Sequence, residues 1–260
     1  MKAPILSEML ARGETPEILF WVGCAGSFDE RAQRVTRAFA TILEHANIKY
    51  AILGTEESCS GDPAKRAGNE FLFQMQAMAN IDLMNAYQVK KIVTACPHCF
   101  NTLKNEYPHL GGNYEVIHHT QLIQELIKAG KLISADEHPF QGKRITFHDP
   151  CYLGRGNQVY EAPRHVLEQL DADLVELKRC RQNGLCCGAG GAQMFKEPEK
   201  GTKDINMERM EDVKEAQADV LAVACPFCMT MLRDGVKHSG QDAKTEVLDI
   251  AEIIVSANKL

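Results

Sequence analysis

The stretch "KKIVTACPHCFNTL" at residues 90–103 has a counterpart, "ADVLAVACPFCMTML", at residues 218–232. Each consists of a short apolar run, typical of a buried strand, followed by a Cys-Pro-x-Cys motif. An offset of 129 residues relates the two motifs. Self-similarity at a fixed spacing indicates that the chain contains two copies of one structural unit.

The cysteines upstream of these motifs repeat in the same order. An offset of 127 residues relates Cys24 to Cys151 and Cys59 to Cys186, which is close to the offset of the motifs themselves. Each half therefore carries the same series of cysteines, and the duplication is predicted to extend over nearly the whole chain.

The two copies define a domain division. We predict an N-terminal repeat at 1–132, a linker at 133–142 and a C-terminal repeat at 143–260. The linker is polar and contains Pro139 and Gly142, as a boundary between two units should.

Within each copy, apolar runs with the period of strands alternate with amphipathic segments with the period of helices. "EILFWVGC" (17–24) and "KRITFHDPC" (143–151) are examples of strands, and "DERAQRVTRAFATILEHA" (29–46) is a helix with one apolar stripe. This alternation predicts an α/β fold of tandem βαβ-type units with parallel sheets, related by a pseudo-twofold axis. The cysteines then lie at the carboxyl ends of strands, where open α/β sheets place their sites. In the segment 70–86 we expect the large apolar side chains to fill the core, namely Phe71, Phe73, Met75, Met78 and Met84.

The composition narrows the class of protein. The chain has 260 residues, 45% hydrophobic residues and a net charge of −6, which argues against nucleic-acid binding and a polybasic membrane tether. Residues 1–20 carry several charges, so no signal peptide is expected, and no stretch is long and apolar enough for a direct membrane span. The protein is expected to be cytoplasmic. If it works peripherally at the inner face of a membrane, a partner must hold it there. Ten cysteines in such a chain favour metal binding over disulfides.

The second half carries five cysteines that can converge from three strand ends. Thiolates select zinc, copper(I) or iron–sulfur clusters, and a zinc ion needs only four ligands. A multi-iron cluster can use the fifth, because the adjacent Cys186 and Cys187 can reach different irons. Gly188, Gly190 and Gly191 allow the loop to point backbone N–H groups at sulfur. The predicted ligands are Cys151, Cys186, Cys187, Cys225 and Cys228.

These motifs resemble the cysteine-rich CCG domain of heterodisulfide reductase, found in its B subunit and in the carboxy-terminal part of its D subunit. "HDPCYLGR" (148–155), "CCGAGG" (186–191) and "ACPFCMTML" (224–232) carry the resemblance, which extends from Trp21 to about Ile254. It implies a noncubane [4Fe-4S] cluster on the five cysteines, which in heterodisulfide reductase cleaves a disulfide in two one-electron steps. It also implies a partner: an iron–sulfur or membrane-anchored redox subunit, or an electron-transfer flavoprotein.

The first half departs from this pattern at one position, where Cys59-Ser60-Gly61 replaces the double cysteine. Four thiolates suit either a structural zinc ion or a cubane [4Fe-4S] cluster, and both remain open. The predicted metal ligands are Cys24, Cys59, Cys96 and Cys99.

Beyond the ligands, Cys186, Cys187 and His148 are candidate catalytic residues, since His148 precedes Cys151 closely and could donate a proton. We interpret His118 and His119 as strand-end residues, and Cys180, which falls outside the repeated series of cysteines, as a half-buried free thiol.

The sequence therefore predicts an iron–sulfur electron-transfer oxidoreductase subunit that moves electrons between a partner redox subunit and a disulfide, quinone or flavoprotein. The alternative is a zinc-stabilised structural or binding module without redox activity. The fifth cysteine, Cys187, separates the two, because zinc would not need it.

Overall fold

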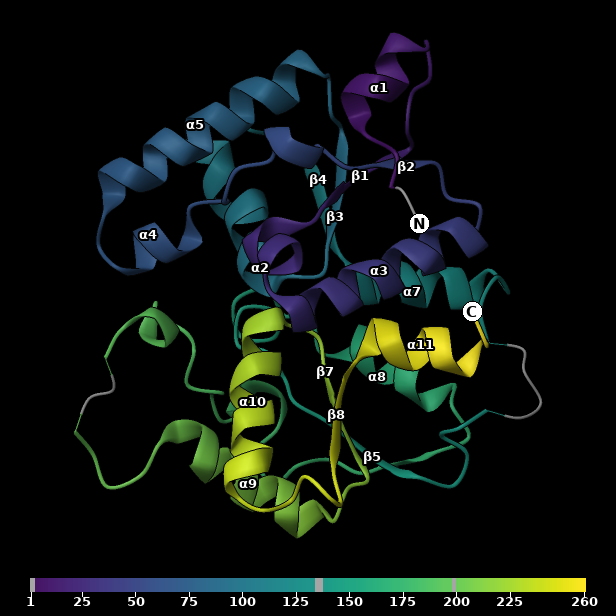
Figure 1. Ribbon diagram of the computed structural model, residues 1–260, viewed down its shortest axis with the longest axis vertical. Helices are drawn as coiled ribbons and strands as arrows, with labels where there is room; N and C mark the ends of the chain where they lie inside the picture. Colours follow the sequence, from purple (N-terminus) through teal and green to yellow (C-terminus); the bar gives the residue numbers. More distant parts are fainter. Residues whose placement is uncertain (1–2, 134–137, 198–199) are drawn as a thin grey trace.

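The computed structural model describes residues 3–133, 138–197 and 200–260 and contains two four-stranded sheets whose strands all run parallel (Figure 1). The predicted α/β class and the duplication are therefore confirmed. Part of the predicted linker, 134–137, lies outside the described residues. The division into repeats at this linker stays a prediction.

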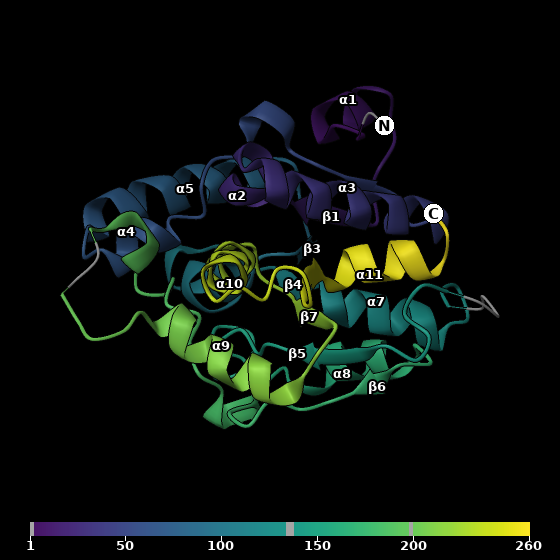
Figure 2. The same ribbon diagram turned by 60° about the horizontal axis from the view of Figure 1, so that its bottom comes forward.

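The first sheet has the strand order β2-β1-β3-β4. Its strands are β1 (Ile18–Trp21), β2 (Tyr50–Ala51), β3 (Lys91–Thr94) and β4 (Glu115–His118). The helices of this half are α1 (Leu6–Ala11), α2 (Gly23–Phe28), α3 (Glu30–His45), α4 (Asp62–Arg66), α5 (Glu70–Ala86), α6 (Pro97–Asn101) and α7 (His119–Lys128), with short turns η1 (Gly54–Glu56), η2 (Thr102–Glu106) and η3 (Tyr107–Leu110). The chain passes from β1 through α3 to β2 and returns through α4 and α5 to β3, and Figure 2 shows α11 of the second half directly below α3.

The second sheet repeats this order as β6-β5-β7-β8. Its strands are β5 (Arg144–Phe147), β6 (Asp173–Leu174), β7 (Val220–Val223) and β8 (Glu246–Asp249). Its helices are α8 (Glu161–Glu168), α9 (Ile205–Ala216), α10 (Pro226–His238) and α11 (Ile250–Ala257), with turns η4 (Arg181–Asn183) and η5 (Gln193–Phe195).

The two halves pack through equivalent helices. Helix α3 contacts α11, and α8, the counterpart of α3, contacts α7, the counterpart of α11. One hydrophobic core runs across this interface and includes Phe39 and Ile123 of the first half together with Phe147 and Ile253 of the second. This reciprocal contact is what a pseudo-twofold axis between two copies requires.

The core prediction for the segment 70–86 is partly wrong. Phe73 and Met84 are buried in α5, as expected, but Phe71, Met75 and Met78 are 76%, 55% and 52% exposed. Helix α5 lies at the outside of the first half (Figure 1), so only one of its apolar faces meets the sheet. His118 and His119 do mark the end of β4 and the start of α7, and Cys180 is a half-buried free thiol, so those interpretations are confirmed.

None of the described helices combines the length and the apolar character that crossing a bilayer requires.

Candidate metal centres

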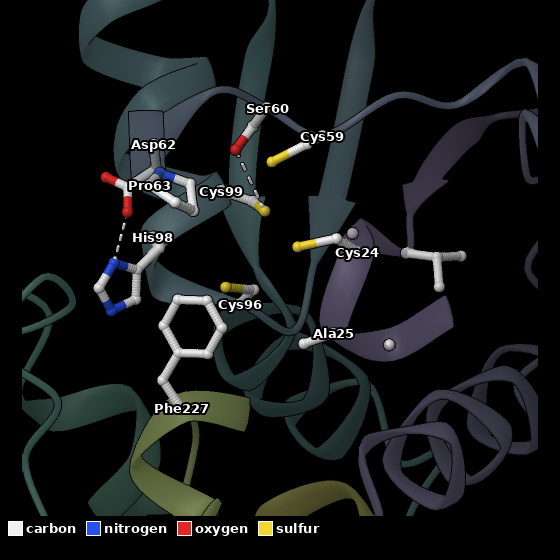
Figure 3. A pocket seen from close by; sticks show the side chains of 13 residues that line it. Cys24, Ala25, Cys59, Ser60, Asp62, Pro63, Cys96, His98, Cys99 and Phe227 are labelled. Atoms are coloured by element: carbon white, nitrogen blue, oxygen red, sulfur yellow. Dashed lines mark hydrogen bonds and ion pairs between the residues drawn. The ribbon is translucent and has the colours of Figure 1, made fainter. Parts of the chain in front are cut away.

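The four cysteines of the first half surround one small cavity at the carboxyl end of its sheet (Figure 3). Cys24 lies in α2, directly after β1, while Cys96 caps the start of α6, directly after β3, and Cys99 lies in its first turn. Strands β1 and β3 are neighbours from which the chain departs in opposite directions, and such a switch point opens a crevice in parallel sheets. Cys59 reaches the same cavity from the loop before α4.

Backbone and side-chain groups already point at the sulfur atoms of this first site. The backbone N–H of Gly61 donates to Cys59 Sγ over 3.5 Å, and the hydroxyl of Ser60 donates to Cys99 Sγ over 3.5 Å. Hydrogen bonding from Cys24 and from Gly61 outweighs burial and lowers the pKa of the Cys59 thiol to about 7. Ser60, which replaces the fifth cysteine, is therefore a hydrogen-bond partner of a predicted ligand.

Gly23 provides the space that the first site needs. Its φ is +77°, and a Cβ atom at this position would lie 3.2 Å from Cys99 Sγ. Glu57 holds the backbone here, since its carboxylate accepts from the N–H groups of Val22 and Gly23 over 3.0 and 2.6 Å.

The five cysteines of the second half lie on equivalent elements. Cys151 follows β5, Cys225 caps the start of α10, Cys228 lies in its first turn, and Cys186 and Cys187 lie in the loop after η4. The second-site thiols are close enough to shift one another's pKa: interaction with the neighbouring Cys186 raises the pKa of both the Cys151 and the Cys187 thiol. Gly188 N–H donates to Cys186 Sγ over 3.3 Å, as its place in the sequence predicted. The structure thus brings all five predicted ligands together.

His148 adds a sixth group to this second site. One of its ring nitrogens and the sulfur atoms of Cys187 and Cys228 all lie within 4.8 Å of one another, and no other such group of three occurs in the described part of the chain. The guanidinium of Arg209 donates from Nε to His148 Nδ1 over 3.3 Å. Burial and the charge of Arg209 lower the pKa of His148 to about 3, so the ring is neutral and carries its proton on Nε2.

This Nε2–H group is buried and has no hydrogen-bond partner among the described residues. Trp21, which occupies the equivalent position at the end of β1, has a buried indole N–H in the same situation. A buried donor without a partner costs about 1–3 kcal/mol. Both halves therefore keep an unsatisfied N–H donor at the strand end beside their cysteines.

An ion-pair network fixes the loops that carry the second-site cysteines. Arg164 is buried and makes two hydrogen bonds to Asp149, of 2.8 and 3.0 Å, and two more to Glu176. Asp149 also accepts from the backbone N–H of Arg181 over 2.7 Å. The segment before Cys151 and the segment leading to Cys186 are tied together in this way.

The two sites adjoin each other across the pseudo-twofold axis. The rings of His98 and Phe227, the variable residues of the two Cys-Pro-x-Cys motifs, lie 4.7 Å apart between centroids. Both residues line the first-site cavity (Figure 3). The ring of His98 also lies 4.5 Å between centroids from the ring of Tyr152, which follows Cys151 of the second site. Sequence reasoning did not single out His98 or Trp21, although aligning the two copies pairs them with Phe227 and His148.

The sequence profile of the CCG cysteine-rich domain matches the chain twice, at residues 18–104 and 145–233. The chain belongs to the CCG family of cysteine-rich domains. Both matches cover the strands and cysteine loops of one half, so this CCG protein consists of two CCG units.

The named relatives that this CCG protein matches are oxidoreductases or their subunits. It is 45% identical to the "Probable iron-sulfur-binding oxidoreductase FadF" of Bacillus subtilis over 98% of this chain and 36% of the relative. It is 43% identical to the "EtfAB:quinone oxidoreductase" of Syntrophomonas wolfei over 94% of this chain and 35% of the relative. It is 36% identical to the D subunit of the dihydromethanophenazine:CoB–CoM heterodisulfide reductase of Methanosarcina barkeri, over 93% of this chain and 59% of the relative. The chain spans about a third to three fifths of the length of these relatives, which support iron–sulfur binding and electron transfer.

Proposed function

We propose that this chain is an electron-transfer unit whose second half binds a noncubane [4Fe-4S] cluster through Cys151, Cys186, Cys187, Cys225 and Cys228. The observation that carries the proposal is the buried group of His148, Cys187 and Cys228, whose ligand atoms lie within 4.8 Å of one another. The half-buried Cys151 and Cys186 and the buried Cys225 lie on the adjoining loops. A single zinc ion would leave one of these thiols without a role. When bound, the cluster supplies one-electron redox chemistry.

The polar groups around the second site fit such a cluster. The orphaned Nε2–H of His148 is a donor that needs a sulfur acceptor, and inorganic sulfide or a thiolate provides one. Gly188 N–H already faces Cys186 Sγ. These donors would stabilise negative charge on the sulfur ligands. His148 is therefore proposed as a hydrogen-bond donor, while its catalytic proton transfer stays a prediction, as do the catalytic roles of Cys186 and Cys187.

For the first half we propose a cubane [4Fe-4S] cluster rather than zinc. Four sulfur atoms at about 2.3 Å from one zinc ion lie about 3.8 Å apart. Among the described residues, no three sulfurs of Cys24, Cys59, Cys96 and Cys99 all approach within 4.8 Å of one another. The wider spacing favours a multi-iron occupant, and the buried N–H of Trp21 offers a donor to it.

The electrons are proposed to pass between a partner redox subunit or an electron-transfer flavoprotein and a disulfide or quinone. Relatives support this choice: one is named for reducing a quinone with EtfAB, and another belongs to a heterodisulfide reductase. Such a partner would also decide whether the chain works in the cytoplasm or at a membrane.

The test is metal analysis of anaerobically purified protein. The wild-type chain should carry about four irons and four inorganic sulfides at the second site, and the double variant Cys186→Ser/Cys187→Ser should lose them with the associated visible absorbance. Cys180→Ser is the matched control and should keep them, because this thiol lies outside the ligand set. Full iron and unchanged absorbance in the double variant, or zinc in place of iron in the wild type, would refute the proposal and favour the zinc-stabilised module.

A further inference from the structure

The two halves differ at two positions beside their cysteines. The offset of 127 residues that relates the first cysteines of the halves also relates Trp21 to His148 and Ser60 to Cys187. In the second half, His148 and Cys187 offer a ring nitrogen and a sulfur atom that lie within 4.8 Å of each other. An indole N–H, in contrast, only donates hydrogen bonds. The first half therefore places a donor where the second half places a group that can bind metal.

The side chain of Trp21 is fully buried, and its donor has no partner. Trp21 is the last residue of β1, it is 0% exposed, and Nε1 makes no hydrogen bond within the described part of the chain. Burying a donor without an acceptor is costly. An unpaired N–H group beside a metal site therefore indicates an acceptor that is completed when the metal binds.

Gly23 shows which sulfur atom borders this donor. A Cβ atom at Gly23 would lie 3.2 Å from Cys99 Sγ and 4.0 Å from Trp21 Nε1. Both atoms therefore border the space that this glycine leaves open. The carboxylate of Glu57 holds the glycine in place, since it accepts from the N–H of Gly23 over 2.6 Å. Cys99 is thus the ligand that the indole N–H can approach.

Cys99 already accepts one hydrogen bond. The hydroxyl of Ser60 donates to Cys99 Sγ over 3.5 Å, as a dashed line in Figure 3 marks. The cysteine is 5% exposed, so little water competes for its sulfur. Hydrogen bonds to the sulfur ligands of an iron–sulfur cluster favour its more negative, reduced state and so raise its reduction potential. A second donor to the same sulfur would add to this effect.

We propose that Trp21 is a positioning residue whose N–H group donates a hydrogen bond to Cys99 in the metal-loaded protein and raises the reduction potential of the first-site cluster. This rests on the proposed function, since it needs a cluster at the first site. The cluster takes up one electron from an external reductant, and no bond forms or breaks within the side chain of Trp21.

The first experiment uses the fact that the chain contains a single tryptophan. Ultraviolet resonance Raman spectra include an indole N–H band whose frequency depends on hydrogen bonding, and here the band comes from Trp21 alone. In the metal-loaded wild type, the band should lie at the frequency of a hydrogen-bonded indole. It should move to the frequency of a free N–H group when a chelator removes the metal. A free N–H band in the loaded protein overturns the role of Trp21.

The second experiment measures the reduction potential of the full, metal-loaded chain by potentiometric titration with electron paramagnetic resonance. The signal that persists in Cys186→Ser/Cys187→Ser belongs to the first site. Trp21→Phe keeps an aromatic ring and removes the N–H group. At the wild-type midpoint potential, its ratio of reduced to oxidised first-site cluster should fall about tenfold, which for a one-electron couple is about 59 mV. The matched control Tyr50→Phe removes a buried ring donor at the opposite end of the sheet, where Tyr50 pairs with Ile18, and should leave the ratio unchanged.

An unchanged potential in Trp21→Phe overturns the role of Trp21, and the Raman comparison decides the matter if this variant assembles no first-site cluster. Zinc in place of iron at the first site of the wild type overturns it as well, because zinc has no redox chemistry. Those outcomes leave the second-site cluster of the proposed function intact, which fails only if the wild-type second site contains no iron.

Discussion

The rings of His98 and Phe227 lie 4.7 Å apart between centroids and at 55° to each other, although the two residues occupy the same position in different repeats. Equivalent residues of two copies meet only near the axis that relates the copies. The two Cys-Pro-x-Cys motifs therefore adjoin each other at this axis, and each metal site has the motif of the other half as its neighbour.

Removing the first ligand of the second site should leave the first site loaded. In Cys151→Ser the four thiols Cys24, Cys59, Cys96 and Cys99 remain, and they come from elements of the first half alone. Elemental analysis should therefore still find iron, or zinc, bound to this variant after the second-site iron is lost. A folded variant with no bound metal would contradict the independence of the two sites.

Cys187→Ser converts the second site into the ligand set of the first. We expect electron transfer to an artificial acceptor to fall to the background level, because the fifth thiolate is missing. Four thiolates remain to hold a metal, so the melting temperature should stay within about 4 °C of the wild type. The reciprocal variant Ser60→Cys adds a fifth thiol to the first site. Activity should not require this thiol, so the rate of electron transfer should stay unchanged. Full activity in Cys187→Ser, with none in a folded Cys59→Ser variant, would show that the first site is the working one.

Gly23→Ala should remove metal from the first site. The new Cβ atom would lie 3.2 Å from Cys99 Sγ, and the left-handed backbone at φ +77° adds about 1–2 kcal/mol of strain. Gly13→Ala is a matched control, since Gly13 has φ +74° and nothing within 4 Å of the new atom. Metal analysis should show loss of first-site metal in Gly23→Ala alone. Equal metal content in both variants would mean that this contact does not matter.

Arg164→Met should destabilise the second half strongly. It leaves the buried carboxylate of Asp149 without its partner, and breaking a buried ion pair from one side costs about 3–5 kcal/mol. The thermal midpoint should fall by roughly 10 °C. Arg12→Met breaks the exposed pair with Glu14 and should cost less than about 1 kcal/mol. Similar melting curves for the two variants would rule out a structural role for the Arg164–Asp149 pair.

Helix α5 shows where sequence patterns stop being informative. Its segment is apolar on more than one face, so the sequence predicts a helix but not which side chains are buried. Phe73 and Met84 face the core, while Phe71, Met75 and Met78 face outward. Only the position of the helix on the sheet decides between them, because burial depends on what the rest of the chain places against each face.

The sequence alone determined the duplication, the α/β class and the positions of the nine cysteines now proposed as ligands. These are properties of spacing and periodicity, which each half carries within itself. The tertiary structure decided what crosses between the halves: the contact between the rings of His98 and Phe227, Phe227 lining the first-site cavity, and α3 packing on α11. The offset that pairs His98 with Phe227 is visible in the sequence, but their contact arises because the pseudo-twofold axis passes between the two motifs. The orientation of that axis is set by packing over the whole interface, which no local pattern encodes.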